Sequence, residues 1–280
     1  MQRAHAGQLV SLVVLQLREG LRWLESLLEL APEAPPRLRA GALAAAGRLA
    51  SELGLAEQAR PRYEESLTLA RAAGDRTYEA WALHGLGYVA VLQGDRKHGR
   101  TLLERSFELF LELGQHAPAG GRLSYLCYLA RLDGDVRAAR SYAERSVEQY
   151  RQAGDVAGVL GSQVDLGDVA LIERDVIGAA GWYRTVLQAS PDDNELMYVL
   201  AGLAAVAAAT GRAQAAARLW GAAERIESGH DRGIDPHNRA QYQSLLGDIE
   251  PGAVVAGRAA SREEVVALAR EIAETASVDA

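Results

Sequence analysis

The feature that most constrains the fold is a repeat with a period of about forty residues. Two series of glycines keep this period: Gly54, Gly94 and Gly134, and Gly74, Gly114 and Gly154. Aspartates and alanines keep it as well: Asp95, Asp135 and Asp175, and Ala50, Ala90, Ala130 and Ala170. A fixed period of this length is the signature of a repeat architecture in which each unit is one supersecondary element.

Each unit has the pattern of two helices. Apolar residues recur at helical spacing, as in YEESLTLARAAG and LLERSFELFLELG. The first glycine series, usually followed by Asp, predicts a tight turn between two helices, and the second series predicts the end of the second helix. We therefore predict an all-α chain of helical hairpins. These hairpins must stack into a solenoid, because one hairpin alone cannot bury both of its apolar faces.

The repeat divides the chain into three predicted parts of one continuous solenoid. Residues 1–36 are expected to form an N-terminal capping helix pair, residues 37–228 five hairpins, and residues 229–280 a loop with capping helices. The fifth hairpin is expected to be short, because Gly211 comes early and Pro191 replaces the usual glycine between units. Atypical ends are expected in a solenoid, since a terminal unit presents one face to water.

Composition excludes several functions. The net charge of -7 argues against direct nucleic-acid binding, because phosphates favour a basic protein face. The apolar runs are too short to span a bilayer, so no membrane association is expected. The single cysteine, Cys127, excludes an internal disulfide and a cysteine metal cluster, and it suits a cytoplasmic protein.

Motifs for chemistry are weak. GLGYVA fits the dinucleotide fingerprint G-x-G-x-x-G/A, but the preceding RTYEAWALH predicts a helix instead of the required strand. His230, Asp231, Asp235 and His237 flank one loop and have ligand chemistry for a metal, although a solvated polar loop explains them more simply. We therefore predict no catalytic residue, no metal and no cofactor. A catalytic set assembled across several repeats is the open alternative.

The repeat resembles the tetratricopeptide repeat (TPR) in its forty-residue form. Leu86, Gly87, Ala90 and Gly99 match the small and large positions of that family. The resemblance implies a right-handed superhelix of helical hairpins with irregular capping helices. In addition, GLRWLESLLELAPEAPPRLRAGALAAAG and GLAAVAAATGRAQAAARLWGAAERI are similar to the C-terminal region of actinobacterial LuxR-type, MalT-like ATPase transcription regulators. The sequence has no G-x-x-x-x-G-K-S/T, so the resemblance implies either the sensor or interaction part without its ATPase or a stand-alone relative.

The TPR resemblance also implies a binding face. In this family the first helix of each hairpin lines the concave surface, which places Trp81, His84 and Tyr88 inward. Their spacing of three and four residues keeps them on one side of a helix. The period extends this face to further residues: Arg48, Ser51, Ser124, Tyr128, Arg131, Asp168 and Tyr198. An opposing interpretation is that Trp81 and Tyr88 pack between neighbouring hairpins.

From these features we predict a non-catalytic sensor and protein-interaction module of the transcription-regulator type. It would bind a protein or peptide partner, or a small inducer, in its concave groove. Two alternatives are a free-standing TPR scaffold or adaptor, and an enzyme built on a helical-repeat scaffold.

Overall fold

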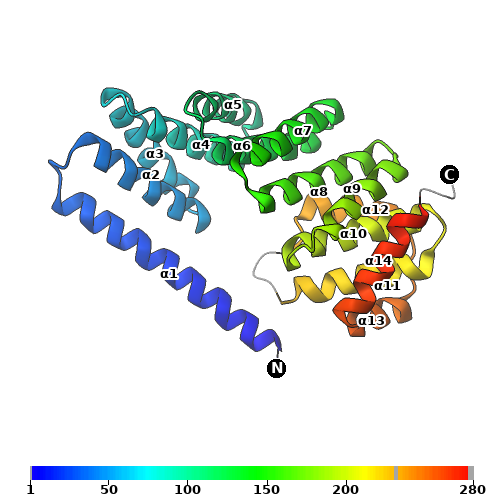
Figure 1. The fold of residues 1–280 in the computed structure, drawn as a ribbon. Helices are drawn as coiled ribbons and strands as arrows, with labels where there is room; N and C mark the ends of the chain where they lie inside the picture. The colour runs from blue at the N-terminus through cyan, green and yellow to red at the C-terminus, as the bar shows by residue number, and fades with distance from the viewer. Residues whose placement is uncertain (1, 230–232, 277–280) are drawn as a thin grey trace. The chain divides into compact units, whose positions relative to one another are not determined.

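The computed structural model of the chain describes residues 2–229 and 233–276, with side chains from residue 14 onward. The described part consists of fourteen helices and contains no strand (Figure 1), which confirms the predicted all-α class. The helices are α1 (Gln2–Leu30), α2 (Pro36–Glu52), α3 (Ala56–Ala72), α4 (Arg76–Leu92), α5 (Arg96–Glu112), α6 (His116–Leu132), α7 (Val136–Ala153), α8 (Val156–Ile172), α9 (Val176–Gln188), α10 (Asp193–Ala209), α11 (Ala213–Glu227), α12 (Pro236–Leu246), α13 (Pro251–Ala259) and α14 (Arg262–Thr275). No helix of the described residues is both long and apolar enough to cross a membrane.

The glycine–aspartate turn explains the period physically. Gly94 has a φ of 89°, a conformation that glycine adopts without a Cβ clash. The amide of Asp95 then donates to the carbonyl of Ala90 at 2.9 Å, which closes α4. The Asp95 carboxylate accepts a hydrogen bond from the amide of His98 at 3.0 Å, which caps α5. One Gly-Asp pair therefore ends one helix and begins the next.

Among the described residues, two turns have a positive φ at a residue other than glycine. Arg174 takes the next place in the first glycine series and has a φ of 62°. Ser190, directly before Pro191, has a φ of 55° and ends α9. The sequence predicts a shortened fifth hairpin, but the shortening falls in the second helix of the fourth hairpin, because α9 has 13 residues whereas α5 has 17.

The N-terminal segment differs from the prediction. The sequence predicts a pair of helices, but residues 2–30 form the single helix α1. Gly20 lies inside this helix, where one glycine costs only about 1 kcal/mol and does not end it. Its missing Cβ leaves room for Leu49, whose Cδ1 lies 3.2 Å from the Cβ position.

The helices group into two compact units. The N-terminal unit is chiefly residues 7–129, and the C-terminal unit is chiefly residues 130–151 and 155–280. In the N-terminal unit the ring of Tyr63 packs where Gly47 and Gly85 lack a Cβ, with Ala50 and Leu86 in the same core. That all five hairpins form one continuous solenoid stays a prediction.

The C-terminal unit has the larger core and the capping helices. Tyr183 and Trp220 are buried in it, and the small residues of α10 allow close packing. Helix α14 begins with a capping box: the amide of Glu264 donates to the Ser261 hydroxyl at 3.2 Å, and the amide of Ser261 donates to the Glu264 carboxylate at 2.7 Å.

Candidate functional site

The predicted inward face of α4 begins with a well-capped helix. The Asp75 carboxylate accepts hydrogen bonds from the amides of Thr77 and Tyr78, at 3.1 and 3.0 Å. This cap fixes where α4 starts, and it therefore fixes which residues share a face. Trp81, His84 and Tyr88 all lie partly buried on α4.

Tyr88 belongs to an aromatic group that spans two helices. Its ring centre lies 5.7 Å from that of Tyr125 on α6, and Tyr125 stacks on Tyr128 at 6.0 Å with 17° between the ring planes. We call Tyr88, Tyr125 and Tyr128 the tyrosine face. All three side chains are partly exposed. The structure thus brings together two predicted residues, Tyr88 and Tyr128, and adds one.

Tyr125 is the residue that sequence reasoning missed. Its spacing of three residues from Tyr128 is a helical signal that could have found it. Burial raises the pKa of Tyr125, and the neighbouring Tyr88 and Tyr128 raise it further. Its hydroxyl therefore stays protonated at neutral pH and acts as a hydrogen-bond donor and acceptor.

Trp81 is a packing residue. Its ring lies 5.1 Å from the ring of Phe110 on α5 in an edge-on arrangement. The guanidinium of Arg122 lies 4.7 Å from the Trp81 ring centre and donates to the carbonyl of Pro118 at 2.9 Å. This geometry supports the opposing interpretation for Trp81, because its contacts join α4, α5 and α6.

His84 lies beside this group and is held neutral. Burial lowers its pKa well below the usual value, and the positive charge of Arg122 lowers it further. Its ring centre lies 6.2 Å from that of Trp81. Its Nδ1 atom is buried and has no hydrogen-bond partner among the described residues.

The predicted binding-face residues of α2, Arg48 and Ser51, differ in exposure. Arg48 is exposed and forms an ion pair with Glu52, 2.6 Å between Nη1 and Oε1. Ser51 is buried, and its hydroxyl donates to the carbonyl of Gly47 at 2.9 Å. Ser51 therefore has a structural contact within α2, whereas the side chain of Arg48 is accessible. Ser124 is partly buried on α6.

In the C-terminal unit two of the predicted site residues, Arg131 and Asp168, are buried. We expected Arg131 and Asp168 to face an open groove, but their side chains are 1% and 0% exposed and contact each other at 3.2 Å. The second oxygen of Asp168 accepts hydrogen bonds from the hydroxyls of Tyr183 at 2.7 Å and Tyr242 at 2.6 Å. The buried charge is thus paired and hydrogen-bonded.

Helix α12 covers this face. Arg131 Nη2 donates to the side chains of Asn238 at 2.8 Å and Gln241 at 2.9 Å. Gln241 also donates to the backbone carbonyl of Asp168 at 2.9 Å. The predicted Tyr198 contacts the start of the same segment, since its hydroxyl accepts from the amide of Asp235 at 3.3 Å. The face that the sequence places in a groove is therefore occupied by the chain itself.

Metal binding gains no geometric support from the described residues. Within them no group of three or more His, Cys, Asp or Glu side chains is arranged to hold a metal ion. His237 and Asp235 belong to the α12 segment, where Asp235 caps the helix through the amide of His237 at 2.8 Å. His230 and Asp231 lie outside the described residues. The single cysteine, Cys127, is buried.

The comparisons with known proteins concern the fold. Neither a protein-family model nor a curated protein matches the chain. One similar solved structure is BtubC (BKLC) from P. vanneervenii, with a TM-score of 0.62 and 17% identity over 81% of this chain and 94% of that chain. Another is a Podosopora anserina putative kinesin light chain with nearly identical TPR-like repeats, with a TM-score of 0.56 and 19% identity over 72% of this chain and 100% of that chain. The chain therefore has a TPR-like helical-repeat fold.

Proposed function

We propose that this protein is a non-catalytic protein-interaction module, and that its N-terminal unit binds a partner peptide on the tyrosine face. The observation that carries the proposal is the stacked, partly exposed group of Tyr88, Tyr125 and Tyr128. Tyrosine offers a large contact area and a hydroxyl at a low cost in conformational entropy, and it is enriched among residues that dominate binding energy.

The C-terminal unit supports this proposal with an internal example. Asp168 follows Tyr128 by one period, and the face around it holds helix α12 through Asn238, Gln241 and Tyr242. A face at this position of the repeat can therefore accept a helical segment that presents polar and aromatic side chains. We infer that the partner of the tyrosine face is also a short helical or extended peptide.

The finer part of the proposal is a sensor role in a cytoplasmic transcription regulator. Its support is the similarity of the two quoted segments to the helical regions of LuxR-type regulators. A sensor must populate two states that its ligand distinguishes. Hydrogen–deuterium exchange of the α12 amides should therefore change when a peptide binds. Unchanged exchange with bound peptide would favour the adaptor alternative.

A peptide-display selection tests the binding function. Wild-type protein and the variant carrying Tyr88→Ala and Tyr128→Ala should enrich different peptides, because the variant lacks most of the tyrosine face. Tyr142→Ala, a matched change on α7, should leave the enriched set unchanged. Circular dichroism would establish that all three proteins are folded. Identical enrichment by all three would rule out the tyrosine face as the binding site.

A further inference from the structure

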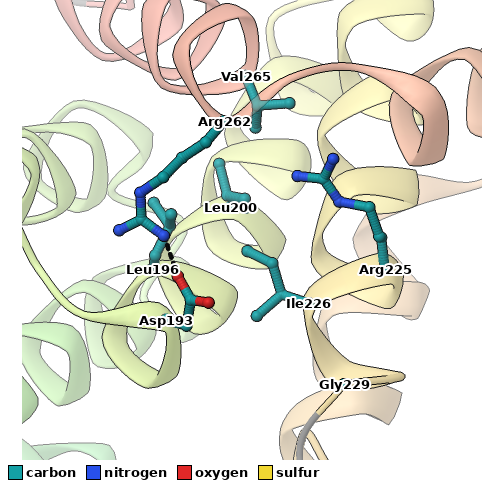
Figure 2. A pocket seen from close by; sticks show the side chains of 8 residues that line it. All are labelled: Asp193, Leu196, Leu200, Arg225, Ile226, Gly229, Arg262 and Val265. Atoms are coloured by element: carbon teal, nitrogen blue, oxygen red, sulfur yellow. Dashed lines mark hydrogen bonds and ion pairs between the residues drawn. The ribbon is translucent and has the colours of Figure 1, made fainter. Parts of the chain in front are cut away.

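The C-terminal unit contains a cavity that the proposed function does not use. Its volume is about 310 Å³, which lies at the lower end of the range for small-ligand sites. Figure 2 shows its lining residues, which come from the first half of α10, the end of α11 with the residues that follow it, and the start of α14: Asp193, Leu196, Leu200, Arg225, Ile226, Gly229, Arg262 and Val265. We call it the arginine cavity.

One side of the arginine cavity is apolar. Leu196 and Leu200 of α10, Ile226 of α11 and Val265 of α14 belong to the buried core of this unit. These side chains can contact the hydrocarbon part of a ligand. They also exclude water, which strengthens the interaction between a charged ligand group and nearby charges.

Two arginines lie on opposite flanks of these apolar side chains, Arg262 beside Asp193 and Arg225 across from it (Figure 2). The Arg225 guanidinium donates to the backbone carbonyl of Ala260, which fixes its position between α11 and the start of α14. A guanidinium has five N–H donors, and the carbonyl of Ala260 is the one hydrogen-bond acceptor of the Arg225 side chain among the described residues. Donors of Arg225 are therefore left for a ligand, and Figure 2 shows its guanidinium directed toward the apolar side chains.

Arg262 is held by an acidic neighbour. It pairs with Asp193 and donates to the carbonyl of Pro191 at 2.9 Å. The lining thus contains two positive charges and one negative charge, an excess of one positive charge. A ligand with a single negative charge would neutralise this excess, whereas a cation would be repelled.

We propose that the arginine cavity binds a small carboxylic acid with an apolar body. The carboxylate would accept hydrogen bonds from Arg225 and Arg262, since guanidinium geometry matches a carboxylate, and the hydrocarbon chain would pack on Leu196, Leu200, Ile226 and Val265. The same chemistry is found in a free acid and in the C-terminal carboxylate of an apolar peptide. The small volume of the cavity favours the free acid.

Titration calorimetry of the full chain with hexanoate tests the proposal. A ligand of about eight non-hydrogen atoms is expected to bind with a Kd of roughly 0.1 to 10 mM. Hexanol, which lacks the charge, and inorganic phosphate, which lacks the apolar body, should bind at least about tenfold more weakly. An acetylated peptide that ends in leucine tests the second possible ligand, the C-terminal carboxylate of an apolar peptide. Binding by that peptide without binding by hexanoate would overturn the free acid as the ligand.

Three variants separate a binding role from a structural one. Arg225→Gln should weaken hexanoate binding roughly tenfold or more, because a charged hydrogen-bond donor is lost. Asp193→Asn should tighten binding about threefold, because it removes the carboxylate that competes for Arg262; damage to the fold would not tighten binding. Arg258→Gln, a matched change outside the lining, should leave the Kd unchanged. Absence of hexanoate binding, or equal affinity of all variants, would overturn the proposal.

Discussion

At the scale of single residues, the buried carboxylate of Asp168 needs partners that compensate its charge. Removing a carboxylate from water is costly unless partners compensate the charge. Arg131 supplies the charge, and Tyr183 and Tyr242 supply hydroxyl donors. Loss of Asp168 would remove the closer of the two acidic contacts of Arg131, since Asp165 lies at 3.5 Å and Asp168 at 3.2 Å, so these residues depend on one another for stability.

The first prediction concerns this network. Asp168→Ala should lower the free energy of unfolding by about 3 to 5 kcal/mol, because it removes the nearest counter-charge of Arg131 and leaves the buried hydroxyls of Tyr183 and Tyr242 without their acceptor. Urea denaturation would measure the change. Asp248→Ala, at an exposed aspartate, should change the value by less than about 0.5 kcal/mol. A loss below 1 kcal/mol for Asp168→Ala would contradict the assignment of a tightly coupled network.

The second prediction concerns pH. Burial raises the pKa of Asp165 to about 7; Arg131 opposes this shift, and Asp168 adds to it. The unfolded chain releases this proton near pH 4, so between about pH 4 and 7 the folded state holds one proton more. The Asp165 contribution to stability therefore falls as pH rises through this window.

Asp165→Asn removes that dependence. Relative to wild type, the variant should gain about 1 to 3 kcal/mol of unfolding free energy between pH 5 and pH 8. Paired urea denaturations at the two pH values would measure the difference, in which the contributions of all other groups cancel. A difference between variant and wild type that is the same at both pH values would contradict the raised pKa.

At the scale of elements, close backbone approaches decide where helices cross. A Cβ on Gly257 of α13 would lie 2.0 Å from the carbonyl oxygen of Arg218 on α11, and one on Gly221 would lie 2.1 Å from that of Val254. Both glycines are thus required by the crossing of α11 and α13. By contrast, a Cβ on Gly161 of α8 would meet no atom within 4 Å.

These two kinds of glycine give opposite predictions. Gly257→Ala should lower the free energy of unfolding by about 1 to 3 kcal/mol, because the helices must move apart. Gly161→Ala should raise it by up to about 1 kcal/mol, because alanine is the better helix former and has space. Thermal unfolding of the two variants would compare them. Equal effects of both substitutions would show that the crossing is not as close as described.

Local elements were predictable and long-range contacts were not. The turns at Gly94 and Asp95 rest on hydrogen bonds within a few residues, so the sequence pattern alone predicts them. Tyr88 and Tyr128 follow from the phase of the repeat. The burial of Asp168 depends on Tyr242, which lies 74 residues away in an irregular helix that no repeat pattern places. The single helix α1 was missed because its sequence lacks the repeat.

At the scale of the whole molecule, the same position of the repeat is covered in one unit and partly exposed in the other. In the C-terminal unit the first-helix face around Asp168 is covered by α12, while the tyrosine face in the N-terminal unit has aromatic side chains that are partly exposed. Under the proposed function, one position of the repeat serves self-contact in the C-terminal unit and partner binding in the N-terminal unit. The proposed function therefore requires the tyrosine face to be a binding surface.

The affinity of a display-selected peptide for Tyr125 variants tests this central claim most directly. Fluorescence anisotropy should show that Tyr125→Ala raises the Kd about thirtyfold, because a central aromatic contact is lost, while Tyr125→Phe changes it less than tenfold. Tyr142→Ala on α7 should have no effect. A Kd that is the same for wild type, Tyr125→Ala and Tyr142→Ala would contradict the account.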